Sequence, residues 1–319
     1  MCSILSWSGL LPKGALTRLL VQSESRGRDS TGVAFRTLDE AGRAMNLCYR
    51  QTVPARTFVE LHKKFMSDAR RSRQGIAHCR RASPGMPVDN PNAHPYVYPA
   101  SSRGFLFAHN GRIENWRDVK EQFCARFGAE LEKLVAESGV SGETPEDAAS
   151  KIVAGGTGVP EELATEVRAV LDRVRYVSKA TTDSMVLGPC VEDLDFSPLV
   201  GCMSVTWIKA DRVFAYRCSK EAVSANVVWR YLEPKEDEPS GDQTVTVVAS
   251  TPEILSASFE LLPNVEFNLE LTGINEGKVY ELTPTGIEDR GRVPSPTPEE
   301  DAFTSATVED KDGVPLVTA

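Results

Sequence analysis

Short apolar runs and helical patterns follow one another along the chain without the regular alternation of a doubly wound sheet. Residues 2–7, CSILSW, alternate small and apolar side chains as a buried strand does. Residues 15–25 carry apolar side chains at helical spacing. These patterns predict an α+β layered domain. Further strands are expected at 32–35, 75–78, 104–108, 204–208, 213–216 and 245–249 and in a hairpin at 265–282, and a further helix at 57–72.

The middle of the sequence changes to a helical pattern. KEQFCARFGAELEKLVAE and PEELATEVRAVLDRVRYV are separated by a glycine-rich break at 155–158. We therefore expect a helical insertion at about 117–177, between two strand-rich halves. From residue 286 the chain is rich in Pro, Thr and acidic residues, which predicts one domain over 1–285 and a disordered tail over 286–319.

Composition narrows the class of protein. The 319 residues are 41% hydrophobic, enough for one large domain or two small ones. A net charge of −9 gives no general attraction to nucleic acid or to an anionic membrane surface. No apolar run approaches the roughly 18 residues of a membrane span, and the first residues lack a basic leader. We expect a cytoplasmic protein that binds neither nucleic acid nor a membrane.

Cysteine and histidine usage bears on metal and disulfide chemistry. Seven cysteines, an odd number without paired spacing or a CxxC motif, predict reduced thiols and no structural zinc. Folding could bring together three of the four histidines, which lie at 62, 78, 94 and 109. No pair has the spacing of helix ligands, so structural histidines are the preferred interpretation and metal binding the alternative. We expect neither a metal nor another cofactor.

Cys2 follows the initiator methionine directly. Removal of Met1 would leave a thiol and an α-amine on one residue. An α-amine has an unperturbed pKa of about 7.7 to 8.0, so part of it is neutral at physiological pH and can act as the base for the thiol. On its own, a Met-Cys start also occurs by chance.

Three further segments carry candidate chemistry. Asn110 and Gly111 follow an apolar strand, where an amide side chain and a backbone N–H could stabilise an oxyanion, although Asn-Gly turns are common. Arg80 and Arg81 end another strand, and a guanidinium can bind an α-carboxylate bidentately, although a surface arginine is the default. Asp183 could bind an ammonium group or cap a helix.

Taken in order along the chain, these motifs resemble the glutaminase domain of class II glutamine amidotransferases. The resemblance covers roughly residues 2–285. It implies the fold of the N-terminal-nucleophile hydrolases, a four-layer αββα sandwich of two antiparallel sheets. The motifs that carry it are Cys2, the run RGRDSTG at 26–32, HCRRAS at 78–83, Asn110-Gly111, Thr182-Asp183-Ser184, the stretch 201–217 and Val248-Ala249-Ser250.

The resemblance implies the chemistry of the reaction. Cys2 would attack the side-chain amide of glutamine, and the Asn110 amide with the Gly111 N–H would hold the tetrahedral oxyanion. A glutamyl thioester would form, ammonia would leave, and water would release glutamate.

The resemblance also implies how the substrate is bound. Arg80 would bind the α-carboxylate of glutamine and Asp183 its α-ammonium group. Ser83 falls where the family has a hydroxyl in the pocket wall, Arg26 in the loop beside the terminal amine, and Arg81 in the loop that closes over glutamine.

The sequence differs from the family pattern at three positions, where the family usually has Gly, Trp and Glu and this chain has Ser3, Arg81 and Met185. No signature of a synthase domain occurs in the 319 residues, so we expect a separate synthetase to accept the ammonia. Two alternatives remain. One is a non-enzymatic binding or regulatory module, suggested by Arg81 and Met185. The other is an amidohydrolase for a different γ-glutamyl amide, in which Arg81 selects an additional anionic group.

Overall fold

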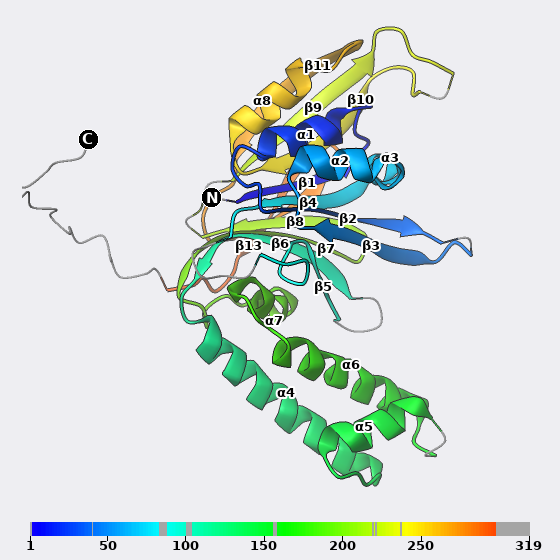
Figure 1. Ribbon diagram of the computed structural model, residues 1–319, viewed down its shortest axis with the longest axis vertical. Helices are drawn as coiled ribbons and strands as arrows, with labels where there is room; N and C mark the ends of the chain where they lie inside the picture. The colour runs from blue at the N-terminus through cyan, green and yellow to red at the C-terminus, as the bar shows by residue number, and fades with distance from the viewer. Residues whose placement is uncertain are drawn as a thin grey trace, which may run out of the picture.

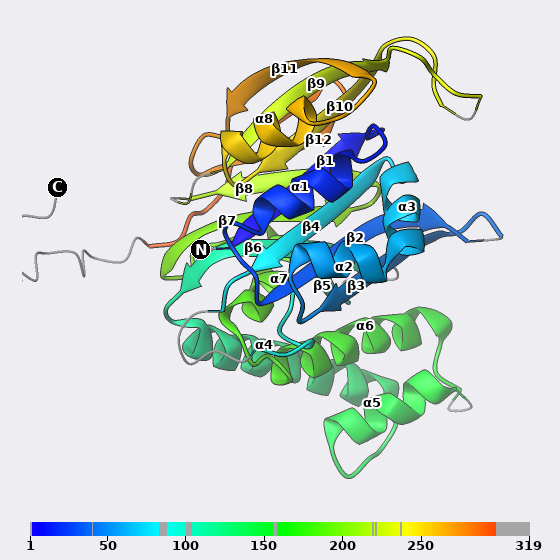
Figure 2. The same ribbon diagram turned by 45° about the horizontal axis from the view of Figure 1, so that its top comes forward.

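In the computed structural model, two antiparallel β-sheets pack face to face and helices cover both outer faces (Figure 1; Figure 2). The structure describes residues 2–39, 41–82, 88–99, 104–155, 158–218, 220, 222–236 and 238–297. No helix within these ranges has the length and apolar character needed to cross a bilayer.

Sheet A has seven strands in the described part of the chain, in the order β11-β9-β10-β1-β4-β2-β3. The amino-terminal strand β1 lies between β10 and β4, with Leu5 opposite both Ala249 and Ala77. The most amino-terminal part of the chain is therefore held inside the sheet. The strands are β1 Ser3–Gly9, β2 Ser30–Leu38, β3 Ala44–Gln51, β4 Gln74–Arg80, β9 Val223–Tyr231, β10 Gln243–Ala249 and β11 Val265–Gly273.

Sheet B has six strands in the described residues, in the order β13-β12-β8-β7-β6-β5. The short strand β5 pairs with β6 only from Tyr96 opposite Phe107 to Tyr98 opposite Phe105, so the second half of β6 has a strand neighbour on one side only, β7. The strands are β5 Tyr96–Tyr98, β6 Phe105–Ile113, β7 Gly201–Lys209, β8 Arg212–Arg217, β12 Lys278–Thr283 and β13 Gly286–Arg292.

The helices divide between the two outer faces (Figure 2). Those on sheet A are α1 Ala15–Ser23, α2 Ala55–Leu61, α3 Lys63–Arg71 and α8 Pro252–Glu260. Those on the side of sheet B are α4 Trp116–Ser138, α5 Pro145–Ala154, α6 Glu161–Ser178, the 3-10 helix η1 Asp183–Val186 and α7 Leu187–Asp193. The helices α4, α5 and α6 form the insertion expected at about 117–177, and they extend away from the sheets in Figure 1.

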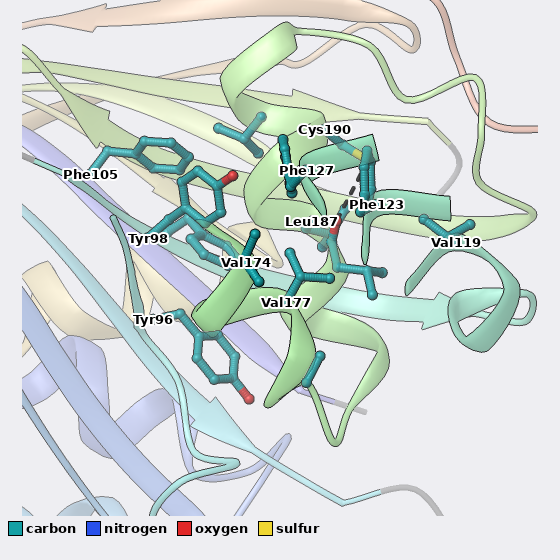
Figure 3. Packing of buried hydrophobic residues seen from close by; sticks show 14 of the residues in the cluster. Tyr96, Tyr98, Phe105, Val119, Phe123, Phe127, Val174, Val177, Leu187 and Cys190 are labelled. Carbon is teal, nitrogen blue, oxygen red and sulfur yellow. Dashed lines mark hydrogen bonds between the residues drawn. The ribbon is translucent and has the colours of Figure 1, made fainter. Parts of the chain in front are cut away.

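Three apolar cores correspond to the interfaces between the layers. One lies between sheet A and its helices and includes Trp7 and Leu19. A second lies between the sheets and includes Ile4 and Ala108. The third joins sheet B to the insertion, and Figure 3 shows aromatic residues of β5 and β6 facing α4, α6 and α7. These three interfaces define four layers, which confirms the predicted αββα arrangement.

Two expectations from the sequence are wrong. Residues 265–282 do not form a hairpin, because β11 pairs with β9 in sheet A whereas β12 pairs with β8 and β13 in sheet B. The tail does not begin at 286, because residues 286–292 form β13 at the edge of sheet B, and residue 297 still bonds to 199 and 201. Residues 298–319 lie outside the described part.

Candidate active site

Strand alternation directs Cys2 and Arg80 toward the layer between the sheets. Ile4 of β1 and Ile76 of β4 both lie in the core between the sheets. Because side chains on one face of a strand are two residues apart, Cys2 and Arg80 continue these two rows. β1 and β4 are neighbouring antiparallel strands, so the two rows end side by side at one end of the sandwich.

Asn110 reaches the same layer from the opposite sheet. Ala108 of β6 lies in the core between the sheets, and Asn110 is two residues further on the same face. The Asn110 Nδ2 donates to Ser250 Oγ at 3.4 Å, and the Ile4 backbone N–H donates to the same oxygen at 3.0 Å. Ser250 therefore connects Asn110 of one sheet to the strand that carries Cys2 in the other.

The sulfur of Cys2 is held by the backbone of Arg81. The Arg81 N–H donates to Cys2 Sγ at 3.3 Å, and the thiol donates to the Arg81 carbonyl oxygen at 3.3 Å. Cys2 as a whole residue is half-buried. Burial of the sulfur raises the thiol pKa and outweighs the hydrogen bond from Arg81, which lowers it. A protonated thiol at neutral pH needs a base before it can act as a nucleophile.

The loop 26–29 holds the end of β4 beside Cys2. A Cβ at Gly27 would overlap the backbone of Arg80 and Arg81, so glycine allows the loop to pass directly over this segment. The Asp29 N–H donates to Arg80 O at 2.9 Å, and the Asp29 carboxylate accepts from Ala82 N–H at 2.8 Å. The RGRDSTG motif thus fixes the backbone against which the sulfur rests.

Arg26 lies on the other side of Cys2. Its Nε donates to the Cys2 carbonyl oxygen at 3.0 Å, so the guanidinium contacts the main chain of the residue proposed as nucleophile.

The two predicted charge contacts for the substrate are both near Cys2. The Arg80 side chain is buried, and its positive charge lowers the pKa of the Cys2 thiol, whereas the Asp183 carboxylate raises it; burial of the sulfur exceeds either effect. The Asp183 carboxylate accepts from Ile113 N–H at 3.1 Å and from Ser184 N–H at 2.9 Å. Because an ionised carboxylate offers about four acceptor positions, these bonds orient Asp183 and leave capacity for an ammonium group.

Gly111 lies within β6, where a side chain would not fit. Its φ is +143°, and a Cβ would overlap the carbonyl oxygen of Cys202 on β7. Along a strand, successive N–H groups point to opposite sides. The N–H groups of His109 and Ile113 donate to side chains on the side away from β7, so the same alternation turns the Gly111 N–H to that side, between them.

The remaining predicted residues are placed as follows. Ser83 lies outside the described residues. The Arg81 side chain is exposed and, with the segment 24–29, lines a pocket of about 240 Å³. Ser3 is buried and donates to Ser23 Oγ at 3.0 Å, and Met185 packs against the core of the insertion. The three departures from the family pattern thus leave the contacts of Cys2, Asn110 and Asp183 in place.

Several residues at this site were not identified from the sequence. Ser250, Asp29 and the histidines at 78, 94 and 109 make contacts that depend on pairing across the two sheets. Within the described ranges, no group of three or more His, Cys, Asp or Glu residues is arranged to hold a metal ion.

Comparisons with known proteins match part of this chain. Residues 3–128 match the family model of class II glutamine amidotransferases. The glutamine–fructose-6-phosphate aminotransferase of Listeria innocua is 34% identical over 130 residues, 39% of this chain and 19% of the relative. The enzyme of the same name from Aquifex aeolicus is 37% identical over 127 residues, 38% of this chain and 19% of the relative. The match thus spans about a fifth of these relatives.

Among solved structures, glutamine phosphoribosylpyrophosphate amidotransferase from B. subtilis aligns with 91% of this chain and 49% of its own, at 13% identity and a TM-score of 0.48.

Proposed function

We propose that this chain, which over residues 3–128 matches the family model of class II glutamine amidotransferases, hydrolyses the side-chain amide of glutamine through a thioester on Cys2. One observation carries the proposal. A half-buried cysteine, a buried guanidinium, an amide side chain and an anchored carboxylate come from the start of β1, from β4, β6 and η1 to one end of the layer between the sheets.

The nucleophile is the Cys2 sulfur after removal of Met1. The raised thiol pKa keeps the sulfur protonated at neutral pH, so the α-amine of Cys2 takes the thiol proton, directly or through water. The Arg81 N–H then stabilises the sulfur anion, because it already points at Sγ.

The sulfur attacks the amide carbon of glutamine, and the carbonyl oxygen becomes an oxyanion. The Asn110 Nδ2 and the Gly111 N–H donate to this oxygen. The C–N bond then breaks, the nitrogen takes the proton held by the α-amine, and ammonia leaves. Water attacks the thioester, the C–S bond breaks, and glutamate and the free thiol are formed.

Selectivity for an amino-acid amide comes from two opposite charges. Arg80 binds the α-carboxylate of glutamine and Asp183 its α-ammonium group. A charge-assisted hydrogen bond contributes about 1.5 to 3 kcal/mol, so an analogue without either group should bind at least about tenfold more weakly.

The ammonia is used outside the described residues. The described helices and strands form the sandwich and its helical insertion. We propose that a separate synthetase accepts the ammonia. Glutamine is the substrate, and no step requires a cofactor.

The direct test is release of glutamate from glutamine by purified protein from which Met1 has been removed, alone and with a co-purifying synthetase. We expect turnover that Cys2→Ala abolishes. Cys124→Ala, which changes a thiol on the insertion helix α4, is the matched control and should retain it. Binding of glutamine without turnover under both conditions would instead support a regulatory module.

A second candidate is hydrolysis of a γ-glutamyl amide whose amine portion carries an anionic group. The pocket lined by Arg26, Arg28 and Arg81 favours it, because its two carboxylates are already engaged, Glu24 with Arg28 and Asp29 with Ala82 N–H. If γ-glutamyl amino acids have a higher kcat/KM than glutamine and Arg81→Ala reverses that order, the second candidate replaces the first.

A further inference from the structure

Three buried imidazoles form a stack beside the candidate oxyanion strand. His78 lies on β4, His94 on the segment before β5, and His109 on β6. The ring centroids of His78 and His94 are 4.2 Å apart, and those of His94 and His109 are 6.1 Å apart. The glutaminase chemistry proposed above does not use any of these side chains.

Two of the imidazoles bind the backbone of the third residue. His78 Nε2 donates to the His109 carbonyl oxygen at 3.0 Å, and His94 Nδ1 accepts from the His109 N–H at 3.2 Å. A carbonyl can only accept and a backbone N–H can only donate, so both tautomers are determined. His78 carries a proton on Nε2, and His94 has an unprotonated Nδ1.

These bonds occur along the part of β6 that, among the described residues, pairs with a strand only on the β7 side. β5 ends its pairing at Phe107. Beyond it, side chains take the place of the missing strand, with His94 Nδ1 at the His109 N–H and Asp183 Oδ2 at the Ile113 N–H. The Gly111 N–H is flanked on both sides by N–H groups that side chains have fixed.

The stack also reaches the ammonium-binding side of the site. His109 Nδ1 lies 3.0 Å from Ser184 Oγ, and Ser184 follows Asp183, whose carboxylate accepts from the Ser184 N–H. At the other end, His78 is two residues before Arg80 on β4. The imidazoles therefore connect the strands that carry Arg80 and Asn110 with the helix that carries Asp183.

The segment with His94 is seated closely on sheet A. A Cβ at Gly32 would overlap the carbonyl oxygen of His94, so only glycine lets this segment lie on β2. Arg50 Nη1 donates to Pro95 O at 2.8 Å, and Thr181 Oγ1 donates to Asn92 Oδ1 at 2.6 Å. These contacts hold His94 against the stack.

We propose that His78 and His94 are positioning residues, which clasp the backbone of His109 so that the Asn110 amide and the Gly111 N–H point at the substrate oxyanion. The inference rests on the proposed glutaminase function. The groups that face the stack are the guanidiniums of Arg80 and Arg50, the Asp183 carboxylate beside His109, and the Tyr96 ring, which lies 4.8 Å from His94. Both imidazoles act as neutral groups.

The test compares apolar and hydrogen-bonding replacements. His78→Leu and His94→Leu remove the two bonds, whereas His78→Gln keeps a donor and His94→Asn keeps an acceptor. Loss of a single oxyanion donor costs about 10²- to 10³-fold in kcat. Misalignment of the donors should cost about 10- to 100-fold, with KM for glutamine within about threefold. The Gln and Asn variants should recover most of the loss. His62→Leu, on the far side of sheet A beside α2 and α3, is the matched control.

Two measurements distinguish a role of His78 and His94 in positioning the oxyanion donors from a general loss of structure at the site. Alkylation of Cys2 by iodoacetamide, which needs no oxyanion site, should proceed at the wild-type rate in both Leu variants. In ¹⁵N-histidine spectra of the wild type at pH 7, His78 and His94 should both be neutral with the proton on Nε2.

Equal losses in kcat and in Cys2 alkylation would overturn the positioning role, as would a His94 imidazole protonated on Nδ1 or unchanged kcat in both Leu variants. If the wild type releases no glutamate, the proposed function fails. The tautomers of His78 and His94 still decide whether the two hydrogen bonds to the His109 backbone exist.

Discussion

The sulfur of Cys2 lies between the N–H and the carbonyl oxygen of Arg81, each 3.3 Å away. This contact uses only the backbone of Arg81, which the loop 26–29 fixes from the other side. The position of the Cys2 sulfur therefore does not depend on the side chain at 81. The arginine found there instead of the tryptophan usual in the family is free to serve the neighbouring pocket.

The first prediction concerns the reactivity of the Cys2 thiol. Burial raises its pKa, so the thiolate fraction should keep increasing above the ordinary cysteine value of about 8.5. We expect the rate of Cys2 alkylation by iodoacetamide, followed by peptide mass spectrometry, to rise steadily between pH 8 and 10. Free cysteine in the same tube is the reference. A plateau below pH 8 would show a thiolate that needs no base.

Asn110→Ala removes the side-chain donor to the oxyanion but leaves the Gly111 N–H. We expect kcat for glutamine hydrolysis to fall by about 10² to 10³ with little change in KM, because the donor acts mainly in the transition state. Ser250→Ala, which removes the hydroxyl that holds Asn110, should lower kcat less. A rise in KM at constant kcat in Asn110→Ala would assign this amide to substrate binding instead.

The pH dependence of glutaminase activity tests whether the α-amine of Cys2 is the base that accepts the thiol proton. The α-amine must be neutral to accept the thiol proton, and its unperturbed pKa is about 7.7 to 8.0. Activity should therefore rise with pH through this range and decline below it. Initial rates of glutamate release at saturating glutamine measure this profile. A flat profile between pH 5 and 8 would exclude the amine as base.

The stacked histidines make the stability of the fold depend on pH. Burial lowers the pKa of His78 to about 3 and that of His94 well below its ordinary value. In the unfolded chain these histidines take up protons near pH 6.5, whereas in the folded protein they stay neutral. The free energy of unfolding is therefore greatest above pH 6.5 and decreases as the pH falls from 6.5 toward the lowered pKa values of the folded protein. Each such histidine should contribute about 1.4 kcal/mol per pH unit.

Urea unfolding at pH 7, 6 and 5 measures this slope. His78→Gln should reduce it by the share of one histidine. Equal free energies of unfolding at pH 7 and 5 would show that the imidazoles are charged in the folded protein.

Sequence patterns predicted the elements whose side chains show a clear period. β1 and α1 were found because buried residues recur at regular intervals in them. β3 and β13 were missed because each lies at the edge of a sheet and carries mixed or mostly polar residues. An edge strand is held by backbone hydrogen bonds, which do not require a particular pattern of side chains in the sequence.

Features that depend on pairing between residues far apart in the sequence could not be predicted from the sequence. The strands at 265–273 and 278–283 are adjacent in sequence but join different sheets, so their proximity along the chain suggested a hairpin that does not exist. At the site, the types of residue were recognisable from the family resemblance. Their mutual contacts, such as Ser250 with Ile4 across 246 positions, follow only from the packing of the two sheets.

The central claim is that the Cys2 sulfur attacks the side-chain carbonyl of glutamine. The most direct measurement is peptide mapping by mass spectrometry after treatment with a glutamine-like electrophile, with and without excess glutamine. We expect one adduct, on a Cys2 that has become the first residue, and suppression of this adduct by glutamine. An unmodified Cys2, or an adduct that forms equally well in the presence of glutamine, would contradict it.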